Sequence, residues 1–192
     1  RLGGGDDMKV QKHLAILETE VRRANKIVTD LLDFSRVKQP RRAPAQLNAI
    51  IRDILARQPR PSSVKLELDL IESLPPILVD LDQVGQVFLN LVINAIEAMP
   101  DGGSLTIRTR STSDAVVASV SDTGIGIPPE NLEKIFQPLF TTKTKGIGLG
   151  LAVSRQLIDA NGGALSVESQ IGKGSTFTAI FPIEESESVN HG

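Results

Sequence analysis

The sequence contains no cysteine, no tryptophan and no tyrosine, and only two of its 192 residues are histidines. Without cysteine, the chain can form neither disulfide bonds nor thiolate metal sites. Two histidines also argue against a zinc site with several imidazole ligands. Because Trp and Tyr are aromatic side chains that stack on bases, their absence argues against a nucleic-acid partner.

Long apolar runs are absent as well. No run approaches the roughly 18 residues that a membrane-spanning helix needs, and the chain does not open with a signal peptide. We therefore expect a cytoplasmic segment without direct membrane contact. The chain starts without Met in a glycine-rich stretch, which predicts a fragment of a longer protein whose sensor or membrane segments lie upstream.

Residues 7–37 contain neither proline nor glycine and predict one long helix. Their apolar residues recur at steps of three and four: Val10, Leu14, Leu17, Val21, Ala24, Val28 and Leu31. This spacing is typical of a coiled coil or helical bundle. Since an isolated helix cannot bury such a stripe, we predict a homodimer through this N-terminal helix. The alternative is that the stripe packs against the chain's own domain.

The remaining sequence alternates between strand and helix patterns. Residues 38–46 hold two prolines and predict a linker or short extended piece. Residues 184–192 form an acidic, polar stretch that predicts a disordered tail. Between them we predict helices at 47–57, at 81–98 and from Gly150, and strands at 64–70, 104–111, 114–122, 164–169 and 175–183. Residues 47–183 are therefore predicted to form an α+β domain, a two-layer α/β sandwich with one helical layer on a sheet.

Two asparagines stand out in the predicted helix 81–98. Asn90 and Asn94 are four residues apart, so both amides lie on one face of the helix, among residues that otherwise form core. Since Mg²⁺ favours oxygen ligands, the pair could hold a magnesium ion that bridges nucleotide phosphates. Helix capping or a buried hydrogen-bond network is the structural alternative.

Asp122 ends a predicted strand and begins the segment DTGIGIP. The two glycines that follow let the backbone approach a flat ligand. A carboxylate at this point can accept a hydrogen bond from an exocyclic amine such as adenine N6. Taken alone, an Asp-Thr-Gly turn at a strand end is more often structural.

A third segment, TTKTKGIGLGL at residues 141–151, precedes an apolar helix. Its glycines leave bare amide donors beside a positive helix end, which suits phosphate oxygens, and Lys143 and Lys145 add positive charge. A plain flexible loop is the alternative. The P-loop and the dinucleotide fingerprint are both absent, which excludes those two nucleotide folds.

Together and in this order, the three segments resemble the N box and the first two glycine boxes of sensor histidine kinases. Residues 136–143, FQPLFTTK, look like the F box of that family, and residues 172–182, GKGSTFTAIFP, look like its closing glycine box. Residues 1–37 are similar to the second helix of the family's dimerisation and phosphotransfer bundle.

The resemblance implies the Bergerat ATP-binding fold, with a mixed sheet under one helical layer, and the binding of ATP with Mg²⁺. Asn94 would contact the metal, and Asp122 would recognise adenine with help from Thr176. The implied nucleotide contacts are Asn90, Asn94, Asp122, Gly124, Gly126, Ile127, Phe140, Lys143, Gly148, Leu149, Gly150 and Thr176. Of these, Asn90 and Lys143 would take part in catalysis. Gly124 and Gly126 would make room for the base, and residues 127–149 would form a lid.

The implied reaction transfers the γ-phosphoryl group of ATP to a histidine and then to an aspartate of a response-regulator receiver domain. The family's acceptor histidine lies on the first bundle helix, and no matching string is present here. His13 falls on the second helix and His191 in the tail. We therefore expect this fragment to bind ATP without phosphorylating itself at the usual site. Glu97 also departs from the family, since many relatives carry a basic residue at this position.

Two other interpretations stay open. An ATP hydrolase of the same superfamily would place a glutamate at the position of Asn90 to activate water, and the absence of that glutamate argues against hydrolysis. A non-catalytic, nucleotide-regulated dimerisation module would bind ATP and transfer nothing.

Overall fold

The structure, a computed structural model, describes residues 10–14, 17–18, 21, 25, 39–143 and 146–183. The chain divides into two compact units, Arg1–Arg36 and Val37–Gly192. All described residues of the first unit are helical. The apolar side chains among them, Val10, Leu14, Leu17 and Val21, are exposed. The rest of the predicted helix 7–37, Lys145 and the predicted disordered tail 184–192 lie outside the described residues.

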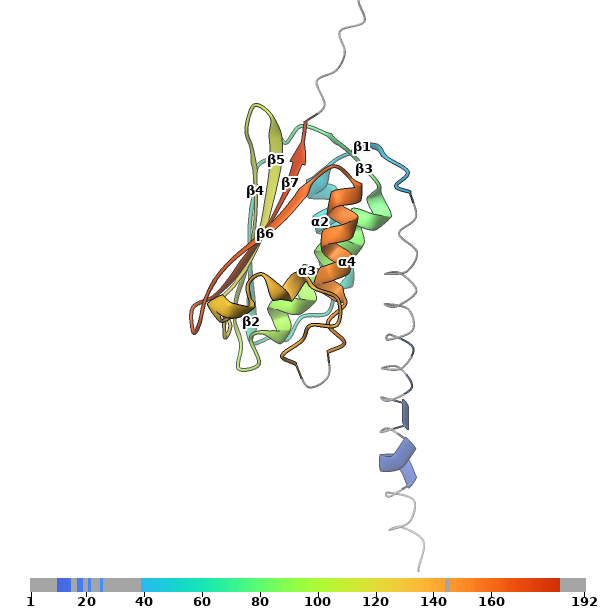
Figure 1. Cartoon of the computed structure of the whole chain (residues 1–192), viewed down its shortest axis with the longest axis vertical. Coiled ribbons are helices and arrows are strands. Elements are labelled where there is room, and N and C mark those ends of the chain that lie inside the picture. The colour runs from blue at the N-terminus through green and yellow to red at the C-terminus, as the bar shows by residue number, and fades with distance from the viewer. Residues whose placement is uncertain are drawn as a thin grey trace, which may run out of the picture. The chain divides into compact units, whose positions relative to one another are not determined.

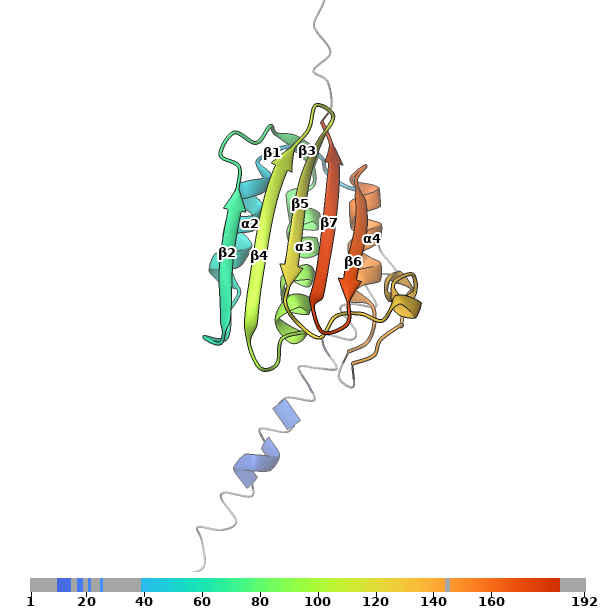
Figure 2. The same cartoon turned by 90° about the vertical axis from the view of Figure 1, so that its left-hand side faces the viewer.

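Five strands form the main sheet of the second unit, in the order β2-β4-β5-β7-β6 (Figure 2). Their bounds are β2 Val64–Leu70, β4 Gly103–Ser111, β5 Ala115–Asp122, β6 Ala164–Gln170 and β7 Gly174–Pro182. β2 pairs with β4 in parallel, and the other pairs are antiparallel. Because β5 is the central strand, Asp122 lies at its end between two neighbouring strands.

Three helices cover one face of this sheet (Figure 1): α2 Leu47–Arg57, α3 Leu81–Glu97 and α4 Gly150–Ala160. Alternate residues of β5 form the core between the two layers, and Val116, Ala118 and Val120 are at most 1% exposed. The helices contribute large buried side chains such as Phe88 and Leu91. The predicted two-layer α+β sandwich with one helical layer is thus confirmed.

A second, two-stranded sheet was not predicted from the sequence. β1 Ala43–Ala45 pairs antiparallel with β3 Ile77–Val79. β1 falls within the predicted linker 38–46, where three residues are too few to show a period-two pattern. The pairing brings the residues before α2 next to the residues before α3.

The start of α3 is tied to the end of α4. Asp80 caps α3, since its Oδ1 accepts hydrogen bonds from the backbone N–H groups of Asp82 and Gln83. Asn161, which is 3% exposed and follows α4, accepts a hydrogen bond from the Asp80 N–H and donates one to Gln83 Oε1. The two helices therefore run antiparallel, and the second half of α3 lies beside the start of α4.

The long segment between β5 and α4 contains two short 3-10 turns, η1 Pro129–Asn131 and η2 Lys134–Phe136. Phe136 packs edge-on against Phe177 of β7, with ring centroids 6.5 Å apart. The Arg155 guanidinium of α4 lies 5.0 Å from the centre of the Phe136 ring. These contacts anchor the middle of the segment between the sheet and α4.

Candidate functional site

The two asparagines lie on the half of α3 that adjoins the start of α4, and both are half-buried. The Asn90 Nδ2 lies 3.4 Å from the Gly150 carbonyl oxygen and 3.4 Å from Ser154 Oγ. Ser154 is fully buried and donates to the same Gly150 carbonyl at 2.8 Å. Asn90 thus contacts the first turn of α4 through its amide N–H groups.

Asn94, one turn further along α3, faces Lys143. The Lys143 ammonium donates one hydrogen bond to Asn94 Oδ1 at 3.1 Å and another to Glu97 Oε2 at 2.6 Å. The structure therefore brings Asn94 and Lys143 together and adds Glu97 to them. An amide oxygen that already accepts a hydrogen bond from a cation is a suitable ligand for a hard metal ion.

Asp122 is 6% exposed and points to the helical side of the sheet. Its Oδ1 accepts a hydrogen bond from the Gly124 N–H at 2.8 Å, and the Ser175 N–H also bonds to the carboxylate. Burial raises the pKa of this carboxyl above its ordinary value of 3.8, while the two N–H groups and the charge of Lys143 act in the opposite direction. The result is a buried acceptor held in a fixed orientation by the backbone.

Thr176, which we expected to assist Asp122, does not lie beside it in this structure. Neighbouring residues of a strand point to opposite faces of the sheet, and Thr176 lies on the face away from the helices, where its Oγ1 is 2.9 Å from Ser121 Oγ. Ser175, which pairs directly with Asp122, is 4% exposed and lies on the helical face. The hydroxyl on the side of Asp122 therefore belongs to Ser175.

Ser169 joins Ser175 on the same face and was also missed. Ser169 pairs with Ser175 across β6 and β7, and their Oγ atoms are 3.0 Å apart. The Ile127 N–H donates to Ser169 Oγ at 2.8 Å, so this serine fixes the backbone at the beginning of the predicted lid. The period-two alternation could have identified Ser175, because it shares a face with the core residue Phe177.

Gly124 and Gly126 are required by the packing of the protein itself. A Cβ atom at Gly124 would lie 2.3 Å from the carbonyl oxygen of Ala98, and one at Gly126 would lie 2.2 Å from that of Gln170. Gly126 also has a positive φ of 72°. We expected these glycines to make room for a base. In the structure they let the loop after Asp122 pass close to the end of α3 and to β6; their role beside a base stays a prediction.

The third segment forms the start of α4. Leu149 is the N-cap residue, and no side chain caps the helix at this end, which leaves backbone N–H groups of the first turn available. Leu149 is 1% exposed, so its side chain is part of the core. Gly148 has a φ of 73°, and a Cβ there would lie 2.3 Å from the Phe140 carbonyl oxygen. Phe140 and Gly148 are thus held together by backbone packing.

A metal ion at this site would depend on few protein ligands. In the described ranges, no three His, Cys, Asp or Glu side chains are grouped so that they could hold a metal ion. Mg²⁺ is commonly bound through one or two protein oxygens, with phosphate oxygens and water as the other ligands. The amide oxygen of Asn94 fits this requirement because it is directed at a cation.

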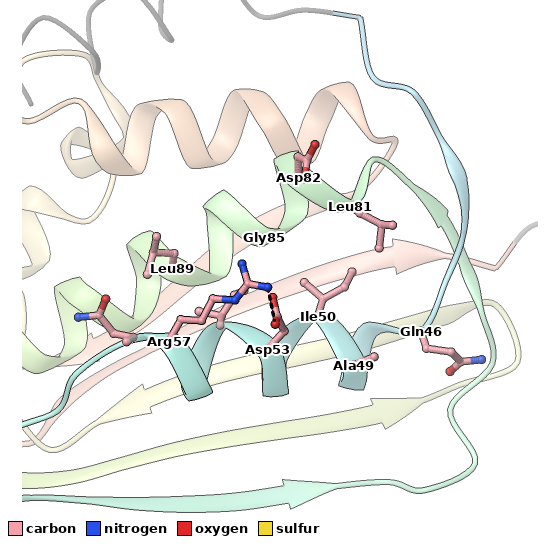
Figure 3. Close-up of a pocket in the computed structure, with 11 residues that line it drawn as sticks. Gln46, Ala49, Ile50, Asp53, Arg57, Leu81, Asp82, Gly85 and Leu89 are labelled. Atoms are coloured by element: carbon pink, nitrogen blue, oxygen red, sulfur yellow. Dashed lines mark ion pairs between the residues drawn. The ribbon is translucent and has the colours of Figure 1, made fainter.

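A separate pocket lies between α2 and α3 (Figure 3). It has a volume of about 560 Å³ and an apolar lining that includes Ile50, Leu81 and Leu89. The ion pair between Asp53 and Arg57, 2.8 Å long, belongs to the same lining. None of the predicted nucleotide contacts lines this pocket.

In the part of the chain that the structure covers, no helix has both the length and the apolar character needed to cross a bilayer.

Comparison with known proteins gives matches across most of the chain. The model of the family described as histidine kinase-, DNA gyrase B-, and HSP90-like ATPase matches residues 79–185. Sporulation kinase E from Bacillus subtilis (strain 168) is 36% identical over 174 residues, which cover 88% of this chain and 24% of that protein. The chain thus spans about a quarter of the length of this relative.

Among the solved structures that match, two examples cover nine-tenths of the chain or more. Full-length ShkA in complex with AMPPNP matches with a TM-score of 0.78 at 27% identity, covering 90% of this chain and 38% of that one. Histidine kinase ThkA in complex with response regulator protein TrrA matches with a TM-score of 0.76 at 29% identity, covering 94% of this chain and 53% of that one.

Proposed function

Because this chain belongs to the histidine kinase-, DNA gyrase B- and HSP90-like ATPase family and is similar to histidine kinase ThkA, we propose that it is the ATP-binding catalytic part of a sensor histidine kinase. The domain binds ATP with Mg²⁺ and transfers the γ-phosphoryl group to a histidine. We expect that histidine on the first helix of the dimerisation bundle, for which no matching string is present among these residues.

One observation carries the proposal: groups from three separate segments converge at one end of the sheet. Asp122 ends β5, Asn94 lies near the end of α3, and Lys143 reaches Asn94 from the segment before α4. The charge of Lys143 also acts on the Asp122 carboxyl, where it opposes the rise in pKa that burial causes. A metal-bound adenine nucleotide requires these three kinds of group, namely an acceptor for an amine, an oxygen ligand and a cation for phosphate.

Each of these side chains has a distinct role in the proposed reaction. Asp122 accepts a hydrogen bond from the adenine amine, and Asn94 holds Mg²⁺ through its amide oxygen. Held there, Mg²⁺ would supply positive charge that offsets the charge of the phosphates. Lys143 and the free N–H groups at the start of α4 bind phosphate oxygens. Because phosphoryl transfer needs little covalent chemistry from the protein, positioning and charge neutralisation account for the catalysis.

The proposed partners are a response-regulator receiver domain and a second copy of this chain. The similarity to ThkA, which was solved with a response regulator protein, supports the first partner. The exposed apolar residues Val10, Leu14, Leu17 and Val21 support self-association through the N-terminal helix. A cytoplasmic location follows from the reaction, since ATP and receiver domains are found there.

Phosphoryl transfer to a supplied histidine tests the proposal. The chain is mixed with ATP, Mg²⁺ and a separately made acceptor helix from the bundle of a sensor kinase. We expect acid-labile phosphate on the acceptor helix and none on the chain itself. Asn94→Ala should lose the transfer while its thermal unfolding stays close to that of the original chain. Rapid ATP hydrolysis without phosphate on the helix would favour an ATP hydrolase, and ATP binding without any reaction would favour a regulatory module.

A further inference from the structure

The Lys143 ammonium bridges two side chains near the end of α3. It donates to Asn94 Oδ1 at 3.1 Å and to Glu97 Oε2 at 2.6 Å, although these residues are 49 and 46 positions away in the sequence. The side chains of Lys143 and Glu97 are 40% and 50% exposed. An ion pair this accessible to water is weak, so a ligand can displace it.

The electrostatics of α3 favour a cation at this place. The last turn of α3 ends with Glu97 and contains no basic residue. The free carbonyl groups at a helix C-terminus carry partial negative charge, so a carboxylate there is unfavourable and a cation is favourable. Lys143 supplies that cation from a distant segment of the chain.

We propose that Glu97 is a positioning residue, which holds the Lys143 ammonium at the Asn94 oxygen until a metal-bound nucleotide replaces it. The proposal rests on the proposed function, because it takes Asn94 as the metal ligand. Asn94 Oδ1 cannot face the ammonium and a divalent ion together, since like charges at contact distance repel each other. Nucleotide binding therefore breaks the contact between Lys143 and Asn94, and the ammonium becomes available to phosphate oxygens. Glu97 opposes this release.

A double-mutant cycle tests whether Glu97 acts through Lys143. Glu97→Gln keeps the size of the side chain and removes its charge, and we expect it to tighten binding of ATP with Mg²⁺ about two- to fivefold, as for a half-exposed ion pair. In a Lys143→Gln background, the same change should leave the affinity unaltered within error. Calorimetry on the four proteins gives the comparison.

Three results of the cycle would overturn the proposal. Equal tightening in both backgrounds would mean that Glu97 repels the phosphates directly. Weaker binding by Glu97→Gln would mean that Glu97 is itself a metal ligand. No change in affinity when Glu97→Gln is made in the chain that retains Lys143 would mean that the ion pair has no influence on nucleotide binding.

A measurement without nucleotide distinguishes failure of this proposal from failure of the proposed function. Amide hydrogen exchange of residues 137–143 in the nucleotide-free chain should rise about two- to fivefold in Glu97→Gln, since the lysine no longer ties this segment to α3. Glu133→Gln, at an exposed acid of the same long loop, is the matched control and should show no change. Unchanged exchange in Glu97→Gln would overturn this proposal alone. Failure of the original chain to bind ATP would refute the proposed function, and this proposal with it.

Discussion

Asp122 is a buried carboxylate at a strand end, and its surroundings shift its pKa in opposite directions. Burial raises its pKa, while the N–H groups of Gly124 and Ser175 and the charge of Lys143 lower it. Burial thus disfavours the ionised form in the nucleotide-free fold. The ionised form is also the one that can accept a hydrogen bond from a ligand amine. Stability and ligand binding therefore oppose each other at this residue.

Replacing Asp122 by asparagine should separate these two effects. We expect Asp122→Asn to stabilise the nucleotide-free chain at neutral pH and to weaken ATP binding about tenfold or more, as for a lost hydrogen bond to a charged group. Because the folded-state pKa lies above the ordinary 3.8, the original chain loses stability as the pH rises through the interval between the two values.

The stabilisation by Asp122→Asn should accordingly grow as the pH rises above 3.8 and vanish below it. Urea unfolding of both proteins over a series of pH values measures the difference in unfolding free energy. A difference that shrinks with rising pH would contradict the assignment of burial as the main cause of the pKa shift.

The two neighbouring hydroxyl residues of β7 offer a matched pair. Ser175→Ala should weaken ATP binding about fivefold, the effect of one lost hydrogen bond, because Ser175 lies on the face of Asp122. Thr176→Ala should leave the affinity within about twofold, since Thr176 points away from the helices and contacts Ser121. Calorimetric affinities of the two variants decide between them, and the reverse order would support Thr176 as first predicted.

Residue types alone were enough to single out Asp122, Asn94 and Lys143, because each has an unusual polar or charged group for its place in the pattern. The contact between Lys143 and Glu97 could not be predicted, since it depends on the path of a loop between residues 46 positions apart. From the resemblance we expected Thr176 to assist Asp122. The choice between Ser175 and Thr176 depends on which face of β7 is buried, a distinction of one residue that the residue types did not show.

At the scale of elements, the long periodic segments were predicted closely. Helix 47–57 and strand 64–70 have the predicted bounds, and helix 81–98 differs from α3 by one residue. β1 and β3 were missed because three-residue strands owe their existence to their pairing with each other and carry too short a pattern. The positions of the glycines were evident, but their close approach to other backbone segments was not.

Two glycines of contrasting surroundings test the packing of the elements. Gly124→Ala should destabilise the fold by about 1–3 kcal/mol, since its Cβ would lie 2.3 Å from the Ala98 carbonyl oxygen. Gly85→Ala, in the interior of α3 where a Cβ meets nothing within 4 Å, should stabilise it by about 0.5–1 kcal/mol. Urea unfolding gives both values, and similar effects of the two changes would contradict the packing described here.

At the scale of the whole molecule, the chain spans 24% of the length of sporulation kinase E. That the histidine receiving the phosphoryl group lies outside the chain stays a prediction. The division into a bundle helix at 1–37, a linker at 38–46 and a catalytic domain at 47–183 stays a prediction, as does the dimer.

Self-association through the N-terminal helix has a direct test. Leu17→Glu places a charge in the exposed apolar stripe and should weaken dimerisation at least about tenfold, because a charge is costly to bury in a helical seam. Lys12→Glu, at another exposed position of the same helix, is the control. Sedimentation equilibrium of the original chain and both variants measures the association, and a monomeric original chain would refute the predicted dimer.

The most direct test of the central claim is an NMR titration of the isotope-labelled chain with a non-hydrolysable ATP analogue and Mg²⁺. The nucleotide site described here predicts that resonances of Asp122, the Asn94 side-chain amide and Gly150 shift with saturating ligand, while those of Ile50 and Leu81 in the separate pocket stay in place. Shifts confined to that pocket, or no shift at Asp122 and Asn94, would contradict it.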